Sequence, residues 1–250
     1  MSLIYGINPV EEAINSGKTI NKIYFQKGNS DIFSLVKKAR DKKIVTVEAD
    51  KRKLDQMITE EGQKQKNSQG IVASVTDYNY FEVSDILEYA KSKNEKPFVI
   101  ILDKIEDPHN LGAIIRTAEC MGVHGIIIQK RNACQVTDTV EKVAVGACSY
   151  VRVARVTNIT ETIKYLKDEG LWIYGLDMEG ASNLYDEKLE APIGLVVGNE
   201  GDGISRLVKE NCDVMIKIPM VGKINSLNAS VSTAMSIYEV IRQKNKSSTK

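Results

Sequence analysis

Residues 193–205 read IGLVVGNEGDGIS, a short apolar run followed by glycine at three of the next six positions. The run Ile193–Val197 has the length and composition of a buried strand. Glycines directly after such a strand allow the backbone to come close to a ligand. Glu200 lies between these glycines and is a candidate functional carboxylate. The segment therefore predicts a ligand site at a strand end.

The order of these glycines argues against a dinucleotide site. They follow the pattern G-x-x-G-x-G, whereas a dinucleotide-binding turn reads G-x-G-x-x-G and follows an early strand. A dehydrogenase with a nucleotide cofactor is therefore disfavoured.

On both sides of this turn, strand-like and helix-like patterns alternate regularly from Phe98 onward. Apolar strands that alternate with helices predict an α/β domain with a parallel sheet covered on both faces. Ligands of such sheets bind outside the carboxyl ends of the strands. The expected strands span residues 98–103, 125–129, 151–156, 171–176, 193–198 and 214–218, and the expected helices span residues 110–121, 158–167, 204–210 and 229–243.

A second loop of interest follows the first of these strands. Residues 107–118 read DPHNLGAIIRTA. Asn110 can cap the helix that follows, and Arg116 is close enough to the helix start to point back toward the sheet edge. In isolation, a helix cap at Asn110 and a surface charge at Arg116 are favoured over a functional role for these two residues.

A third loop follows the last expected strand. Residues 218–230 read IPMVGKINSLNAS, in which Ser226, Asn228 and Ser230 alternate with apolar residues before a long helix. A helix N-cap accounts for one of these polar residues. Together the three loops predict a backbone-rich pocket for a polar cofactor, with no metal and no nucleophilic cysteine.

The first 76 residues form a separate pattern. Short helices and strands predict a compact α/β unit with thirteen Lys and Arg against nine Asp and Glu, a balance of +4. Basic clusters at residues 37–43 and 51–53 supply most of it, and either a solvated helix face or a phosphate-binding patch explains such clusters. Residues 77–97, which contain one amphipathic helix and a polar stretch ending at Pro97, are predicted to be a linker.

Several classes of protein and site are disfavoured by composition. The longest apolar runs are strand-length, far below the roughly 20 residues that span a bilayer, and no secretory signal is visible, so we expect a cytoplasmic protein with no membrane partner. The spacing of the cysteines and histidines predicts free thiols and no metal site. These residues are Cys120, Cys134, Cys148, Cys212, His109 and His124.

In their order and spacing, the three loops resemble the three signature motifs of the SpoU (TrmH) family of RNA 2′-O-methyltransferases. Residues 4–10 and 69–73 of the N-terminal unit resemble the ribosomal-protein-like (L30e-like) substrate-binding domain of one branch, which includes the bacterial 23S rRNA guanosine-2′-O-methyltransferase. The resemblance covers nearly the whole chain. It implies an RNA-binding domain over residues 1–76 and, over residues 98–250, a SPOUT methyltransferase domain with a deep trefoil knot.

The resemblance also implies S-adenosylmethionine as cofactor, RNA as partner and a homodimer whose active site is completed near the interface. The positions that it implies as catalytic or substrate-handling are Asn110, Arg116, Glu200, Ser226 and Asn228. Those that it implies as cofactor-binding are Val197, Gly198, Asn199, Gly201, Ile218, Met220, Ser226, Leu227 and Asn228.

The implied reaction moves the cofactor's methyl group to a ribose 2′-OH. The family proposal has Arg116 activate the hydroxyl, but a guanidinium with a pKa above about 12 is a poor base. We therefore expect Arg116 to stabilise the developing alkoxide and to hold the adjacent phosphate, oriented by Glu200 and Asn110.

Two segments depart from the family pattern. Residues 146–149 read GACS where many relatives have glutamate at the fourth position, and Ser68 stands where relatives commonly have histidine. Neither change touches the three motifs.

The two-domain layout favours 23S rRNA as the substrate; the alternatives are a tRNA 2′-O-methyltransferase and a catalytically idle RNA-binding ribosome-assembly factor.

Overall fold

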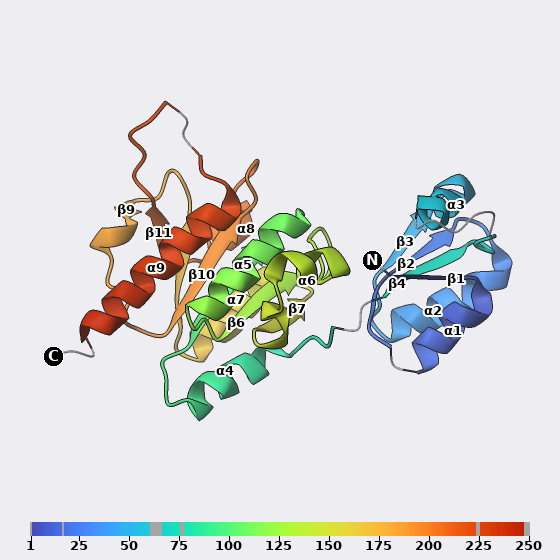
Figure 1. Cartoon of the computed structure of the whole chain (residues 1–250), viewed down its shortest axis with the longest axis horizontal. Helices are drawn as coiled ribbons and strands as arrows, with labels where there is room; N and C mark the ends of the chain where they lie inside the picture. The colour runs from blue at the N-terminus through green and yellow to red at the C-terminus, as the bar shows by residue number, and fades with distance from the viewer. Residues whose placement is uncertain (1, 17, 61–66, 76–77, 224–225, 248–250) are drawn as a thin grey trace. The chain divides into compact units, whose positions relative to one another are not determined.

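The computed structural model of the protein describes residues 2–16, 18–60, 67–75, 78–223 and 226–247. The chain forms two compact units, Met1–Asn79 and Tyr80–Lys250, each with its own sheet and helices (Figure 1). The predicted domain boundary at residues 76 and 77 lies outside the described residues.

The first unit has a four-stranded sheet, whose strands in spatial order are β1 (Ser2–Tyr5), β4 (Ile71–Val75), β2 (Ile20–Gln26) and β3 (Thr46–Ala49). β4 is antiparallel to both neighbours, whereas β2 and β3 are parallel. The helices α1 (Ile7–Asn15) and α2 (Phe33–Asp41) bury their apolar side chains on one face. The helix α3 (Lys51–Glu60) buries Leu54 and Ile58 on the other.

The second unit has the predicted parallel sheet, and every strand pairing described in it is parallel. The α/β fold class is therefore confirmed. In spatial order the strands are β7 (Arg152–Val156), β6 (Gly125–Gln129), β5 (Phe98–Asp103), β10 (Ile193–Gly198), β8 (Trp172–Leu176), β11 (Val214–Lys217) and β9 (Ser182–Asn183).

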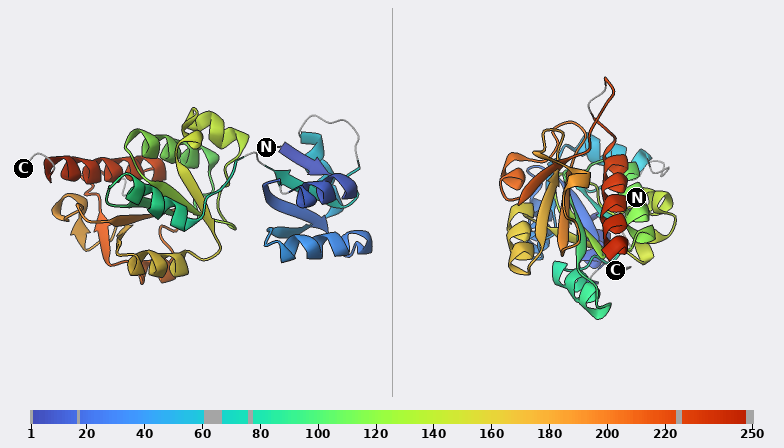
Figure 2. Two further views of the ribbon diagram at one scale, coloured as in Figure 1. Left: turned by 90° about the horizontal axis from the view of Figure 1, so that it is seen from below. Right: turned by 90° about the vertical axis from the view of Figure 1, so that its left-hand side faces the viewer.

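Helices cover both faces of this sheet (Figure 2). On one face lie α5 (Pro108–Cys120), α6 (Asp138–Ala144), the 3-10 helix η2 (Ala147–Ser149) and α9 (Ala229–Ser247). The apolar core of the other face is formed with side chains of α4 (Val83–Ser92), α7 (Ile159–Asp168) and α8 (Arg206–Lys209). The trefoil knot that the resemblance implies stays a prediction.

The predicted linker differs from the structure. Most of residues 77–97 belong to the second unit, because that unit begins at Tyr80 and includes α4. Ile86 of α4 is fully buried in the core with Val99 and Ile127. An amphipathic helix that buries its apolar face in a core is part of the domain rather than a spacer.

The remaining composition-based expectations concern thiols, metals and membranes. Cys120, Cys134, Cys148 and Cys212 are thiols that are not joined in disulfides. Within the described residues no group of His, Cys, Asp and Glu side chains is arranged to hold a metal ion. No helix in the same part of the chain is both long and apolar enough to cross a bilayer.

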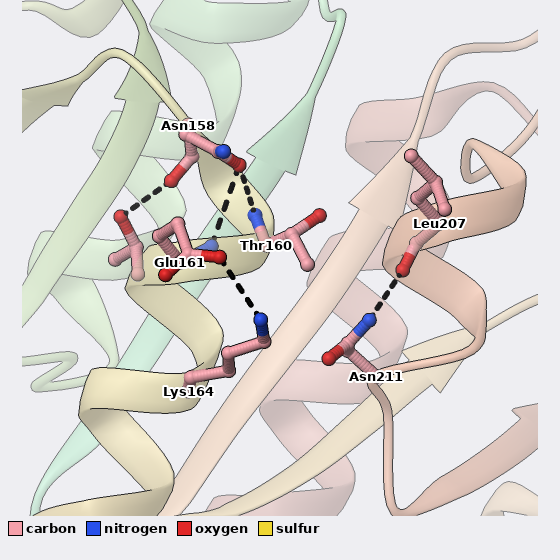
Figure 3. A network of polar contacts seen from close by, with 7 residues as sticks. Asn158, Thr160, Glu161, Lys164, Leu207 and Asn211 are labelled. Atoms are coloured by element: carbon pink, nitrogen blue, oxygen red, sulfur yellow. Dashed lines mark hydrogen bonds and ion pairs between the residues drawn. The ribbon is translucent and has the colours of Figure 1, made fainter.

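Asn158 caps α7, and its removal is expected to destabilise the second unit. Its Oδ1 accepts hydrogen bonds from the backbone N–H groups of Thr160, at 2.9 Å, and Glu161, at 3.3 Å (Figure 3). Replacing an N-cap by alanine costs about 1 kcal/mol, so Asn158→Ala should lower the free energy of unfolding by that amount in urea titrations.

Two further variants control this prediction. Asn158→Asp keeps the acceptor and should unfold like the parent protein. Lys164→Ala removes only the exposed ion pair of Lys164 with Glu161, which should cost less than about 0.5 kcal/mol. An alanine variant at position 158 as stable as the parent would contradict the capping role.

Candidate functional site

Side chains from all three predicted loops meet at the carboxyl edge of the sheet. The Oε1 atom of Glu200 accepts hydrogen bonds from Asn110 Nδ2, at 3.0 Å, and from Asn228 Nδ2, at 2.5 Å. It also accepts one from the backbone N–H of Ala229 at 3.2 Å. Asn228 Nδ2 donates to Asn110 Oδ1 at 2.9 Å as well. One carboxylate oxygen therefore ties the three loops together.

Asn228 is also the helix cap that its position suggests. Its Oδ1 accepts from the backbone N–H groups of Ser230, at 2.9 Å, and Val231, at 3.3 Å, at the start of α9. The side-chain oxygen of Asn228 thus caps α9, and its side-chain nitrogen joins the Glu200 network.

Beside this network lies a cavity of about 230 Å³ at the ends of β8, β10 and β11. Every position predicted to bind the cofactor lines it except Asn228, which adjoins it through Glu200. The predicted lining residues are Val197, Gly198, Asn199, Gly201, Ile218, Met220, Ser226 and Leu227, together with Glu200.

The glycine-rich turn is folded tightly on itself. Asn199 and Gly203 form an isolated antiparallel bridge, and a Cβ atom on Gly198 would lie 2.0 Å from the carbonyl carbon of Gly203. The far end of the turn is fixed by buried Asp103, whose Oδ2 accepts from the N–H of Ser205 at 2.7 Å. Glycine is required at position 198 because backbone packs on backbone there, and this close packing forms one wall of the cavity.

Two family models match the chain. The SpoU rRNA Methylase family model matches residues 97–238, and the model for RNA 2′-O ribose methyltransferase substrate binding matches residues 3–81. The chain belongs to the SpoU rRNA methylase family. The methylase model therefore covers most of the second unit, and the substrate-binding model covers the first.

Relatives match along nearly the whole chain. A TrmH family tRNA/rRNA methyltransferase of Bacillus subtilis is 42% identical over 246 residues, which cover 97% of this chain and 96% of the relative. The SpoU methyltransferase AviRb from Streptomyces viridochromogenes, crystallised with AdoMet, has a TM-score of 0.62 at 22% identity and covers 98% of this chain and 90% of its own. An AdoMet-bound rRNA methyltransferase from Sinorhizobium meliloti has a TM-score of 0.58 at 22% identity, with 96% and 86% covered.

Within this SpoU domain, the sequence reasoning missed an ion pair in the cavity wall. Asp177 follows β8, and its Oδ2 lies 2.5 Å from Lys209 Nζ of α8. Burial raises the pKa of Asp177, but the bonds from Lys209 and from the N–H of Glu179 together hold it below the usual value. The cavity therefore has a charged carboxylate. Its position directly after an expected strand was the signal that could have revealed it.

Other residues in the cavity wall also escaped prediction. They come from the end of β8 and the loop after it, from the glycine-rich turn and from the start of α9. These residues are Leu176, Met178, Glu179, Asp202, Gly203, Ala229 and Ser232.

Arg116 does not join this site within one chain. It is exposed on α5, and among the described residues no hydrogen bond or ion pair links it to Asn110, Glu200 or Asn228. Six residues of α-helix advance about 9 Å and rotate about 240°, so Arg116 and Asn110 face different directions. The expected orientation of Arg116 by Glu200 and Asn110 is not found in a single chain.

Cysteine chemistry is also disfavoured by the structure. Burial raises the pKa of Cys148 to about 11 and that of Cys212 to about 12. Both thiols stay protonated near neutral pH, and a protonated thiol is a poor nucleophile. These two thiols are therefore poor candidates for a covalent catalyst.

Proposed function

We propose that this protein transfers the methyl group of S-adenosylmethionine to a ribose 2′-OH in RNA, with a guanosine of 23S rRNA as the expected target. The observation that carries the proposal is the Asn110–Glu200–Asn228 network beside the cavity that the glycine-rich turn lines, in a chain that belongs to the SpoU family. Support for RNA as the acceptor comes from the substrate-binding match over residues 3–81.

The cavity wall fits the chemistry of S-adenosylmethionine. Ile218, Met220 and Leu227 provide apolar surface suited to an adenine ring. The cavity wall has one lysine, Lys209, which pairs with Asp177, and three further acidic residues, an excess of negative charge that suits a cationic sulfonium and its amino group. The backbone groups of the glycine-rich turn add hydrogen-bonding capacity. When bound, the cofactor supplies an electrophilic methyl group, so the residues of the chain mainly position the acceptor oxygen and manage its proton.

A second cavity is suited to the acceptor ribose. It measures about 220 Å³ and shares Asn199, Glu200, Gly201 and Ala229 with the first cavity, and Lys104 and Asn110 also line it. Because Glu200 Oε1 already accepts three hydrogen bonds, we assign Glu200 a positioning role. Asn110 and Asn228 share that role, Ser226 shapes the pocket, and Arg116 stabilises the developing alkoxide.

We further propose a homodimer whose interface includes the exposed face of α9. Val231, Met235 and Tyr238 recur at helical spacing with 47%, 45% and 59% of their surface exposed. An apolar groove of about 590 Å³ continues from this face to Tyr185 and Pro219. Such a continuous apolar surface is typical of an interface between subunits.

Met235→Glu is expected to convert the dimer into monomers in sedimentation-velocity experiments, because it buries an unpaired charge in the interface. Leu207→Glu is the matched control, since Leu207 is also an exposed apolar helix residue, at 56%, but lies on α8. A parent protein that sediments as a monomer, or equal behaviour of the two variants, would contradict this interface.

The function is tested by tritium-methyl transfer to bulk rRNA and bulk tRNA, followed by mapping of 2′-O-methyl sites in cells with and without the protein. Label in a 23S rRNA guanosine is the expected result. Label confined to tRNA would favour the tRNA enzyme. Absence of label in both RNAs would favour the idle assembly factor and overturn the proposal.

A further inference from the structure

Four loops of the first unit gather at one edge of its sheet. β1, β2 and β3 all end at this edge and β4 begins there, since Tyr5 pairs with Val72 and Gln26 with Ala49. The backbone N–H of Gln26 donates to the carbonyl of Gly70. These loops and the first residues of the helices that follow them are residues 6–8, 27–33, 50–53 and 67–70, here called the loop edge.

Gln69 is held at the loop edge in an uncommon conformation. Its φ is 51°, in the left-handed region that non-glycine residues seldom adopt. Its Oε1 accepts from the N–H of Ile7 at 2.9 Å, and its backbone N–H donates to Asn67 Oδ1 at 3.0 Å. Gln69 is exposed, and because its oxygen is engaged at the start of α1, its side-chain amide is held in a fixed orientation. A fixed N–H donor is suited to reading a base edge or a phosphate.

The loop edge also carries an aromatic side chain and positive charge. Phe33 is 72% exposed at the start of α2, which is unusual for a large apolar residue. The same edge exposes four cationic and two acidic side chains, leaving a positive excess. They are Lys27, Lys51, Arg52, Lys53, Asp31 and Asp50.

In the second basic cluster, at residues 37–43, three of the five basic side chains make contacts within the unit. Lys38 pairs with Glu11 at 3.4 Å, and Lys42 donates to the carbonyl of Ile14 at 2.6 Å. The Arg40 guanidinium lies 5.5 Å from the centre of the Phe25 ring. These contacts distinguish the two clusters that the sequence alone leaves equivalent.

From these observations, which rest on the proposed RNA substrate, we infer that the loop edge is the surface on which the first unit binds RNA. Phe33 stacks on an unpaired base, Lys51 and Lys53 contact phosphates, and the Gln69 amide donates to the RNA. Exposed aromatic rings beside cations are the means by which proteins bind single-stranded segments of RNA.

The test uses the full chain and filter binding of radiolabelled total rRNA from cells that lack the protein. Lys51→Gln combined with Lys53→Gln should weaken binding and reduce the slope of log Kd against log salt concentration by about 1.4 to 1.8. Phe33→Ala should weaken binding about 10-fold without changing that slope, because stacking releases no counterions. Gln69→Glu should weaken binding while keeping the acceptor for the N–H of Ile7.

Matched variants separate these effects from general loss of charge or folding. Lys38→Gln combined with Lys43→Gln removes the same charge from the other cluster, and Gln56→Glu adds the same charge on exposed α3 surface. Both controls should bind RNA like the parent, and all variants should share its unfolding midpoint. Two outcomes would overturn the inference. One is an equal loss of RNA affinity in the two double lysine variants. The other is parental RNA affinity in both the Lys51 and Lys53 double variant and Phe33→Ala.

Methyl transfer distinguishes this inference from the proposed function. If the parent labels no RNA, the proposed function fails, whereas the filter-binding differences still decide the location of the RNA surface. If the parent labels RNA and the loop-edge variants label it equally fast below saturation, the function stands and the inference fails.

Discussion

Gly198→Ala is expected to weaken binding of S-adenosylmethionine by about 10-fold for each hydrogen bond worth about 1.4 kcal/mol that the displaced turn no longer makes to the cofactor. The new Cβ atom would lie 2.0 Å from the carbonyl carbon of Gly203 and 2.3 Å from the N atom of Ile204. Both are backbone atoms, so the turn that lines the cavity must move as a whole. Isothermal titration with S-adenosylmethionine measures the effect.

Gly194→Ala is the matched control on the same buried strand. A Cβ atom there would lie 2.7 Å from Ile173 Cδ1, the far end of a flexible side chain. We expect a modest loss of stability of about 1–3 kcal/mol from overpacking and parental affinity for the cofactor. Circular dichroism checks that both variants are folded. If folded Gly198→Ala binds the cofactor with parental affinity, the glycine-rich turn is not part of the cofactor site.

The architecture of the second unit is predictable because the spacing of apolar residues along the sequence indicates which faces of each strand and helix are buried. A strand such as Phe98–Asp103, apolar on both faces, belongs in a covered parallel sheet, and the carboxyl ends of such strands share one edge. This geometry brings Asn110, Glu200 and Asn228 together from positions far apart in the chain. The three-loop site follows from the sequence for that reason.

Spatial order of strands is much harder to predict. Asp177 and Lys209 meet because β8 lies between β10 and β11, and no local pattern encodes that order. The predicted linker fails for a related reason: the polar residues after α4 resemble a spacer, although the burial of Ile86 makes the helix part of the domain. Long-range packing decides both features.

The detailed role of Glu200 also requires the structure. Flanking glycines indicate a constrained carboxylate, but they do not reveal which groups it binds. In the structure its Oε1 accepts hydrogen bonds from Asn110, Asn228 and Ala229. Glu200 therefore holds the three loops together. Arg116 is absent from this network, so its contribution must be tested separately.

Arg116→Ala is expected to lower the rate of methyl transfer by about 100- to 1,000-fold, the usual effect of removing a group that stabilises transition-state charge. Cofactor affinity should be unchanged, because Arg116 lies outside the lining of the cavity. Arg116→Lys keeps the charge but loses the planar pair of donors, so it should recover only part of the activity. Parental turnover by Arg116→Ala in a tritium-methyl assay would remove Arg116 from the reaction.

A mixing experiment can locate Arg116 relative to the cavity that it serves. Arg116 is exposed, and no hydrogen bond or ion pair among the described residues links it to Glu200. We therefore expect it to act, in the proposed homodimer, on the cavity of the partner subunit. Arg116→Ala and Gly198→Ala homodimers are then each inactive, but a mixed dimer combines the intact arginine of one chain with the intact cavity of the other. Random exchange should restore roughly a quarter of the parental sites. If each site lies within one chain, mixed dimers remain inactive, because both chains carry a defect.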